Sequence, residues 1–199
     1  MHLVVGLGNP GVRYAGTRHN IGARVIEGAA ARWAVSLKES DQARAGPTRV
    51  GGVALALAIP LSWMNDSGTV VSALLTKHAL SPAELIVVHD DLDLPLGRLR
   101  IKLKGGPGGH NGLRSIIAEL GSEEFTRVKL GIGRPPVGVD AADFVLMPFL
   151  AEEREIVDGL CARAIDALEC LLAEGPNAAM NKFHVRDSAE PPEGSEIGR

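Results

Sequence analysis

The sequence predicts a single-domain α/β fold with a twisted, mostly parallel but mixed central sheet that helices cover on both faces. Short apolar strands alternate along the chain with segments whose apolar residues recur at helical spacing. Residues 85–88 are all apolar, as expected for a central strand that is buried on both faces. The chain has 199 residues, of which 45% are hydrophobic, and is therefore long enough to bury one such core.

The first half of the chain supplies strands and helices in turn. Ser81 offers an N-cap, Pro82 a first-turn proline and Glu84 an N3 glutamate, so a short helical turn is expected there. The other expected elements are a strand at residues 3–5, a helix at 21–35, a strand at 49–59 stopped by Pro60, a helix at 68–78 and a strand at 85–88.

The second half continues the alternation and ends in a polar, Pro-rich segment. Gly121 follows one expected helix as a typical C′ residue, and Gly175-Pro176 stops the last helix. We predict one folded domain over residues 1–184 and a disordered tail over 185–199. The expected elements are a strand at 97–104, a glycine-rich loop at 105–109, a helix at 111–120, a strand at 125–132 and a helix at 152–174.

The composition favours a cytoplasmic protein. No apolar run reaches the ~18 residues of a membrane span. The N-terminus has no basic stretch followed by a long apolar region, so a cleaved secretion signal is not expected. Cys161 and Cys170 would face opposite sides of one helix, which excludes a disulfide between them.

Charge is distributed unevenly. The formal net charge is −3, which alone argues against a nucleic-acid partner. Residues 98–134, however, hold eight basic side chains against three acidic ones. Such a segment can hold an anion locally, although it could also be no more than a solvated surface.

Residues 98–104 alternate cations with aliphatic residues. In a strand, the four cations would share one face and the three aliphatic residues the other. The glycine-rich loop then leads into a helix N-terminus, whose backbone N–H groups favour anions. These features predict a phosphate site, and the alternative is an edge strand that its charges protect from aggregation.

Residues 6–11 match the pattern G-x-G-x-x-G after a strand. In a dinucleotide site the helix opens directly on these glycines. Here Pro10 interrupts the motif and residues 14–20 still look like loop. We therefore expect neither a nicotinamide cofactor nor any other cofactor.

His19 and Asp90 are the candidate catalytic pair. A carboxylate at the end of an apolar strand can hold one imidazole nitrogen and leave the other free to take a proton from water. Asp91 and Asp93 compete for this role, and the Asp cluster could instead bind a divalent metal. No second group of ligands accompanies the cluster, so we expect no metal. Ser67 lies outside a G-x-S-x-G elbow, which argues against a serine nucleophile.

Three asparagines, Asn9, Asn65 and Asn111, lie in Gly- or Pro-containing turns at element boundaries. Each uncharged amide can hold an ester carbonyl, a peptide backbone or a ribose hydroxyl. A donor aimed at a forming oxyanion contributes about 2.7–4 kcal/mol to catalysis. The alternative for each asparagine is ordinary turn or capping chemistry.

Several motifs together resemble bacterial-type peptidyl-tRNA hydrolases, in the family's order and spacing over residues 1–184. The matching segments are GLGNPG (6–11) with Tyr14, TRHN (17–20), MNDSG (64–68), HDDLDLP (89–95), GGPGGHNGL (105–113), GIGRP (131–135) and DFVL (143–146). The resemblance implies a monomeric α/β enzyme of translation that binds the acceptor stem and 3′ end of peptidyl-tRNA and hydrolyses the ester between peptide and tRNA.

The resemblance also implies roles for individual positions. His19 matches the catalytic base and Asp90 the carboxylate that supports it. Asn9 matches the residue that distinguishes N-blocked from free aminoacyl-tRNA. The positions that match substrate or tRNA contacts are Tyr14, Trp63, Asn65, His110, Asn111, Lys102 and Lys129.

Three positions depart from the family's pattern. The second motif usually has a lysine before its proline and Phe or Tyr before Met-Asn, whereas this chain has Ile59 and Trp63. The indole should still stack on a base or ribose, in a pocket of different dimensions. Pro107 should stiffen the glycine-rich loop. The rival interpretation is a non-catalytic RNA-binding protein, which would have no need of His19 and Asp90.

Overall fold

The fold is built around one sheet of seven strands. The computed structural model describes residues 1–40 and 42–184. The strand order is β2-β3-β4-β1-β5-β7-β6. The strands are β1 (His2–Gly6), β2 (Lys38–Glu39), β3 (Ala43–Val50), β4 (Val53–Pro60), β5 (Leu85–Asp91), β6 (Leu99–Lys102) and β7 (Thr126–Gly131).

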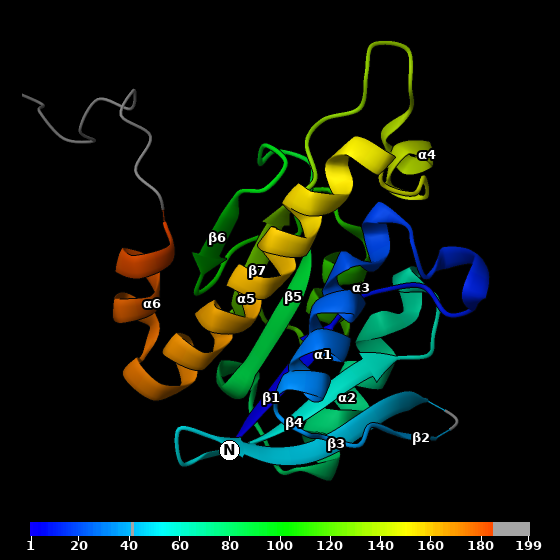
Figure 1. The fold of residues 1–199 in the computed structure, drawn as a ribbon. Helices are drawn as coiled ribbons and strands as arrows, with labels where there is room; N and C mark the ends of the chain where they lie inside the picture. The colour runs from blue at the N-terminus through cyan, green and yellow to red at the C-terminus, as the bar shows by residue number, and fades with distance from the viewer. Residues whose placement is uncertain (41, 185–199) are drawn as a thin grey trace, which may run out of the picture.

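The sheet is parallel in its centre and antiparallel at both edges, as Figure 1 shows. Strands β4, β1, β5 and β7 run parallel to one another. The β2–β3, β3–β4 and β6–β7 pairs are antiparallel. The predicted mixed, mostly parallel α/β fold is confirmed. In such a sheet the loops that leave the carboxyl ends of the parallel strands gather at one edge and form the ligand crevice.

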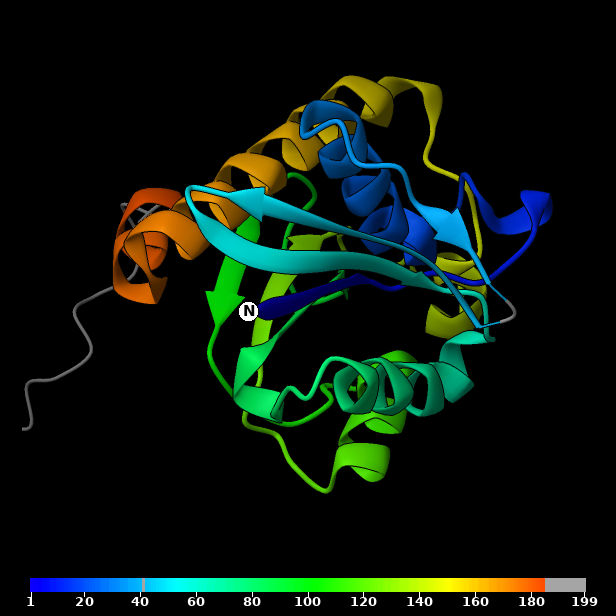
Figure 2. The same ribbon diagram turned by 90° about the horizontal axis from the view of Figure 1, so that it is seen from below.

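Helices cover the sheet on both sides, and Figure 2 shows the two layers. Helices α1 (Ile21–Arg32), α5 (Arg154–Glu174) and α6 (Pro176–Phe183) belong to one face, and α2 (Ser67–Lys77) and α3 (Asn111–Leu120) to the other. Strand alternation separates the two cores: Val4 faces α1 and α5, whereas Leu3 and Val5 face α2 and α3. A short helix α4 (Ala141–Val145) precedes α5.

Most expected elements are present within a few residues of their predicted ends. Helix α3 has the predicted bounds and ends at Gly121 in the left-handed conformation, with φ of 60°. Ser81 and Glu84 form the predicted capping box before β5. Helices α1, α2 and α5 are confirmed, with α1 ending three residues earlier than expected.

The strand predicted over residues 49–59 is wrong. The segment is a hairpin in which β3 and β4 pair antiparallel, with Val50 opposite Val53. Gly51 and Gly52 both have positive φ and form the two-residue turn. The glycine pair is therefore a turn signal, whereas the prediction treated it as the interior of a strand.

Three elements were not predicted at all. Gly175-Pro176 ends α5 but also begins α6, because proline is tolerated in the first turn of a helix. Helix α4 and strand β2 are too short to give a periodic signal. The strand expected over 97–104 is shortened to β6, which is the edge strand of the sheet.

Two glycines bring α1 close to the sheet. A Cβ on Gly22 would overlap the Val88 carbonyl oxygen, and one on Gly6 would overlap the Gly22 carbonyl oxygen. The Ala23 N–H donates to the Leu7 carbonyl (2.9 Å), so the start of α1 is occupied by the chain itself. This close packing leaves no room for a dinucleotide at the G-x-G-x-x-G motif, and it places the residues just before α1 beside the end of β5.

No helix among residues 1–40 and 42–184 has the length and apolar character needed to cross a bilayer. Cys161 and Cys170 are buried and free, as expected. The predicted tail over 185–199 lies outside the described residues, so the proposed domain boundary stays a prediction.

Candidate active site

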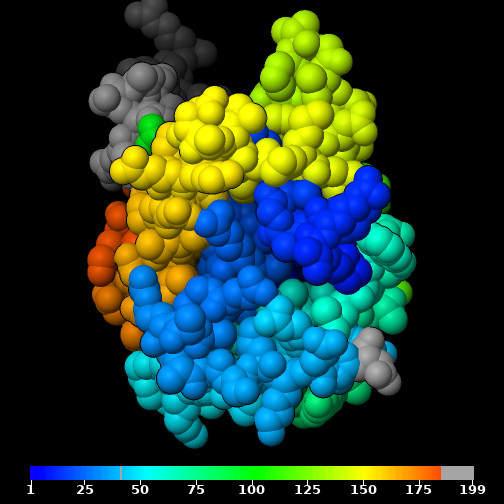
Figure 3. Space-filling view, turned by 45° about the vertical axis from the view of Figure 1, so that its right-hand side comes forward, coloured from blue at the N-terminus to red at the C-terminus, as the bar shows by residue number. Residues whose placement is uncertain are grey.

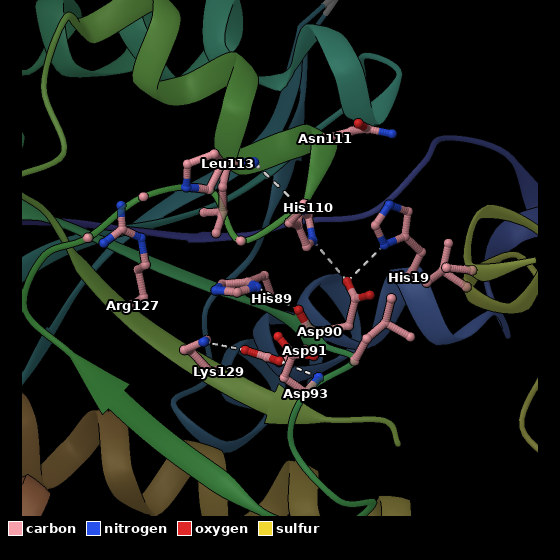
Figure 4. Close-up of a pocket in the computed structure, with 18 of the residues that line it drawn as sticks. His19, His89, Asp90, Asp91, Asp93, His110, Asn111, Leu113, Arg127 and Lys129 are labelled. Carbon is pink, nitrogen blue, oxygen red and sulfur yellow. Dashed lines mark hydrogen bonds and ion pairs between the residues drawn. The ribbon is translucent and has the colours of Figure 1, made fainter. Parts of the chain in front are cut away.

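A cavity of about 750 Å³ lies at the carboxyl end of β5 and beside the first half of β7. Figure 4 shows the side chains that point into it. Its walls come from segments far apart in the sequence: the turn before α1, the end of β5, the glycine-rich loop with the start of α3, strands β6 and β7, and α4. Of the residues predicted from the sequence, it is lined by His19, Asp90, Lys102, His110, Asn111 and Lys129.

Asp90 is the centre of a hydrogen-bond network at the end of β5. Its Oδ1 accepts from His19 Nδ1 (2.8 Å) and from His110 Nε2 (3.0 Å), and its side chain is 2% exposed. Burial opposes the charged form, but the charge and hydrogen-bond interactions with His110 and His19 outweigh it and hold the pKa of Asp90 well below its usual range. Asp90 is therefore a carboxylate at neutral pH.

The proton position on His110 follows from its surroundings. His110 Nδ1 accepts from the backbone N–H groups of Gly112 (3.1 Å) and Leu113 (3.3 Å). An Nδ1 that accepts has no proton, so neutral His110 carries its proton on Nε2 and donates it to Asp90. The same bonds correct one expectation: these two N–H groups of the α3 N-terminus are used by His110 and are not available to an anion.

His19 has the opposite tautomer. Asp90 as a carboxylate only accepts, so the Nδ1 of His19 carries the proton that binds it. Nε2 then has a free lone pair in a side chain that lines the cavity. A carboxylate on one imidazole nitrogen with an open lone pair on the other is the arrangement of a general base.

The ligand atoms of His19, Asp90 and His110 lie within 4.8 Å of one another, a spacing that could admit a metal ion. A metal would need the lone pair of His110 Nε2. That nitrogen holds the proton, because the lone pair of Nδ1 is already the acceptor for two backbone N–H groups. The donor set therefore fits a hydrogen-bond network better than a metal site.

The three aspartates at and just beyond the end of β5 have different partners, which separates the candidates. Asp91 forms an ion pair with Lys129 and accepts from the Asp93 N–H (2.7 Å). Asp93 is exposed and pairs with Arg134 (2.6 Å). Asp90 alone of the three contacts His19.

His89 is a site residue that the sequence did not reveal. It is 1% exposed, lines the cavity and packs edge-on against His110, with ring centroids 4.9 Å apart. Its Nδ1 donates to the Asp90 carbonyl (2.6 Å). Burial, followed by the charge of His110, lowers the pKa of His89 to about 3, so its imidazole stays neutral. It thus supports the backbone of Asp90 without adding charge.

Cations form the opposite side of the cavity. Arg127 and Lys102 face each other across the β6–β7 pair, and Lys129 lies two residues further along β7. The predicted alternation holds within β6, where Leu99 and Ile101 are buried and the cations between and after them are exposed. Lys104 lies beyond the strand and pairs with Glu124 (3.5 Å).

Arg127 was also missed. It is 2% exposed, stacks on Phe125 at 4.2 Å, and none of its three guanidinium nitrogens has a hydrogen-bond partner among the described residues. Burial lowers its pKa, although the charge of Glu123 opposes this effect. Arg127 and Lys129 lie two residues apart in a predicted strand and so on one face of it, and this spacing could have indicated that Arg127 belongs to the site.

The other four predicted residues lie outside the cavity lining. Tyr14 and Trp63 contact each other edge to face, with centroids 5.7 Å apart, and Trp63 is half exposed. Asn9 Oδ1 accepts from the Met64 N–H (2.9 Å), so its Nδ2 is left to donate. Asn65 is exposed and its Nδ2 donates to Asp66 (3.4 Å). Asn20 pairs with both backbone groups of Asn9, which ties this cluster to the turn that holds His19.

Comparison with known proteins gives a consistent result. The family profile described as Peptidyl-tRNA hydrolase matches residues 3–191. The chain is 48% identical to the peptidyl-tRNA hydrolase of Mycobacterium tuberculosis (strain H37Rv) over 185 residues, covering 92% of this chain and 97% of that protein. It is 51% identical to that of Leifsonia xyli over 186 residues, covering 92% and 96% of the two chains.

A solved structure agrees with these matches. The crystal structure of peptidyl-tRNA hydrolase from Acinetobacter baumannii superposes with a TM-score of 0.86 at 34% identity, covering 92% of this chain and 94% of that chain. Sequence profile, relatives and fold thus point to the same group, and six of the ten site residues that the resemblance implied line one cavity. The chain belongs to the peptidyl-tRNA hydrolase family.

Proposed function

We propose that this protein hydrolyses the ester that joins a peptide to the 3′ end of tRNA, with His19 as general base. The observation that carries the proposal is the hydrogen bond between His19 Nδ1 and the buried Asp90 carboxylate, which leaves Nε2 free in the cavity. Family membership supplies the substrate class. The substrate is peptidyl-tRNA that is lost from translation, and the products of the reaction are free peptide and free tRNA.

The chemical step follows from the tautomers. His19 Nε2 takes a proton from a water molecule as the water oxygen attacks the ester carbonyl carbon. Asp90 stabilises the imidazolium that forms. The tetrahedral intermediate then collapses, the bond to the ribose oxygen breaks, and the imidazolium returns its proton to that oxygen. General-base catalysis of this kind contributes about 10²–10⁴-fold in rate.

Amide donors support the developing negative charge. The Nδ2 of Asn9 is the first candidate, because its Oδ1 accepts from the Met64 N–H and the Nδ2 is left to donate. Asn65 is a second candidate, and Asn111 lies at the cavity edge. An amide that hydrogen-bonds the first peptide group would also allow Asn9 to favour N-blocked over free aminoacyl-tRNA.

The rest of the substrate is held by charge and stacking. In this proposal Lys102, Lys129 and Arg127 contact phosphates of the acceptor stem, and Tyr14 and Trp63 stack on the 3′ end. One protein molecule binds one tRNA as a monomer in the cytoplasm. Every group named in the chemical step comes from a single chain, which is consistent with a monomer.

The test is cleavage of N-acetyl-aminoacyl-tRNA by the wild type and by His19→Asn, each with and without a chelator. In the variant, the asparagine Nδ2 can replace Nδ1 as the donor to Asp90, but no group replaces Nε2. We expect rapid cleavage by the wild type in both conditions. The variant should bind tRNA normally and cleave about 10²–10⁴-fold more slowly.

Three results would reject the proposal or a part of it. Equal rates for His19→Asn and wild type would remove His19 as the base. Loss of wild-type activity with chelator, restored by added metal, would show that a metal takes part. Tight tRNA binding with no cleavage by the wild type would favour the non-catalytic RNA-binding alternative.

A further inference from the structure

Arg18, the residue directly before the proposed base, is buried against the C-terminal half of the chain. Its side chain is 4% exposed. Its Nη1 and Nη2 donate to the two carboxylate oxygens of Glu153, at 3.2 and 2.7 Å, across 135 residues of sequence. Figure 3 shows this junction at the surface, where the deep-blue N-terminal loop abuts the yellow segment near residue 150.

Aromatic rings and backbone bonds complete the junction. The Arg18 guanidinium lies over the rings of Phe144 (4.3 Å) and Phe149 (4.8 Å). The Arg18 N–H donates to the Met147 carbonyl (3.0 Å). Each of these contacts joins the turn that contains His19 to the segment from α4 to α5.

Glu153 is committed to this junction. Its Oε2 also accepts from the Leu150 N–H (2.7 Å). Burial opposes its charged form, but the hydrogen bonds from Arg18 and the Leu150 N–H and the charge of Arg18 together outweigh that effect, so the pKa of Glu153 is lowered. A bidentate pair between a buried guanidinium and a carboxylate has a fixed orientation, in contrast to an exposed ion pair.

The junction has no direct role in the chemistry described above. Arg18 does not line the cavity, whereas its neighbour His19 does. His19 belongs to a three-residue 3₁₀ turn, Arg18–Asn20, which is too short to hold its shape by internal hydrogen bonds alone. On its other side, Asn20 is fixed to the backbone of Asn9. Arg18 therefore supplies the anchor on the N-terminal side of the base.

We propose that Arg18 is a positioning residue: its pairing with Glu153 and its stacking on Phe144 and Phe149 orient His19 toward Asp90. The inference rests on the proposed function and assigns it a further residue. The same contacts hold α4, which forms part of the cavity wall through Ala141, Ala142 and Val145. A shift of about 1 Å in a reacting group can cost about 10²-fold in rate, so loss of the anchor should affect turnover more than binding.

The test uses Arg18→Met, which keeps an apolar stem against the two rings but removes the donors, and Arg18→Lys, which keeps the charge. Turnover of N-acetyl-aminoacyl-tRNA is measured well below the unfolding temperature. The proton NMR signal of His19 Nδ1–H reports its hydrogen bond to Asp90. We expect Arg18→Met to lower kcat about 10- to 100-fold with KM within about twofold, and to move or broaden that signal. Arg18→Lys should recover part of both.

Arg32→Met is the matched control. Arg32 also joins an N-terminal element to α5, through Asp166 (2.6 Å), but it is far more exposed than Arg18. This variant should leave kcat and the His19 signal unchanged. If Arg18→Met fails to fold, Glu153→Gln, which keeps an acceptor but not the charge, should lower kcat about 3- to 10-fold in its place.

A folded Arg18→Met with wild-type kcat and an unchanged His19 signal would overturn the inference, as would a Glu153→Gln variant unchanged in both. The NMR signal also separates the two proposals. If the wild type does not cleave the ester, the proposed function fails, yet the signal still shows whether Arg18 orients His19.

Discussion

The two sides of the cavity differ in how far their hydrogen bonds are satisfied. On the histidine side, Asp90 binds His19 and His110, and His110 is itself fixed by two backbone N–H groups. On the cationic side, the side chains of Lys102 and Arg127 have neither a hydrogen bond nor an ion pair with any described residue. The proposed reacting groups are therefore already arranged in the free protein, whereas we expect the side chains of these two cations to find partners in a bound anion.

This difference has an energetic meaning. Preorganised groups need no rearrangement in the transition state, and their removal lowers kcat. Cations that meet phosphates contribute to binding, and their removal raises KM and changes the response to salt. Substitutions on the two sides should thus have separable kinetic effects, and the predictions below test that separation.

The largest of these effects is expected for Asp90→Asn. The amide keeps the shape but removes the charge that stabilises the His19 imidazolium, so kcat should fall about 100-fold with KM nearly unchanged. Single-turnover cleavage of N-acetyl-aminoacyl-tRNA measures the change. Asp93→Asn is the matched control, because Asp93 is exposed and pairs only with Arg134, and it should retain full activity. An increase confined to KM in Asp90→Asn would contradict the separation.

A smaller effect is expected on the cationic side. Replacement of Lys102 and Lys104 together by Ala should raise KM about 10- to 30-fold at low salt and leave kcat within about twofold. The slope of log KM against log salt should fall by about one to two, since each lost phosphate contact removes roughly 0.7–0.9. Replacement of Lys38 and Lys77 by Ala is the control, because it changes the net charge by the same amount but at β2 and α2. This variant should change neither KM nor the salt slope. Unchanged KM and slope in the first variant would leave β6 as a charge-protected edge strand.

A third prediction concerns Trp63, which lies outside the cavity lining and is proposed to stack on the 3′ end of the tRNA. Trp63→Ala removes half of the Tyr14–Trp63 contact and should raise KM about fivefold, whereas Trp63→Phe, with the ring type usual in the family, should change it less than twofold. Equal KM values for the Ala variant and the wild type would exclude stacking on this residue.

The smallest effect concerns stability. Unfolded His89 binds a proton below its ordinary pKa of 6.5, while the buried imidazole, with a pKa of about 3, does not. The free energy of unfolding should therefore fall as pH drops from 6.5 toward 3. His89→Asn keeps a donor for the Asp90 carbonyl without titrating, so its free energy of unfolding should fall less between pH 7 and 4.5. This window lies above the ordinary Asp pKa of 3.8, so Asp90 contributes little. Urea unfolding of the wild type and of His89→Asn at each pH measures the free energy of unfolding. If this free energy falls equally with pH in both proteins, His89 is not the cause of the loss.

The sequence predicted the fold well where periodicity is strong. Strand β5, which begins with four apolar residues, and the amphipathic α3 were placed because each has a pattern several residues long, although β5 continues three residues beyond its predicted end. The β3–β4 hairpin was missed because its turn consists of two glycines inside a continuous apolar stretch. Short elements such as α4 depend on tertiary packing and leave little trace in the sequence.

The site was predicted unevenly for a similar reason. His19 and Asp90 are 71 residues apart, and no local pattern shows that they meet. The position of Asp90 at the end of an apolar strand suggested the pair, with Asp91 and Asp93 as competitors, and the family resemblance then matched Asp90 to the role. Arg127, His89 and Arg18 were missed because their importance lies in burial, which a single sequence does not display. The expectation of an anion at the α3 N-terminus was wrong because His110 is both a site residue and the cap.

The central claim is that Asp90 holds the Nδ1–H of His19 and leaves Nε2 unprotonated. Nitrogen NMR of histidine-labelled protein near pH 8 tests it directly, with the His19 signals identified by their loss in His19→Asn. The account predicts a protonated Nδ1 with a strongly hydrogen-bonded proton and a bare Nε2. A bare Nδ1 with the proton on Nε2 would contradict it, since that nitrogen could not accept a proton from water.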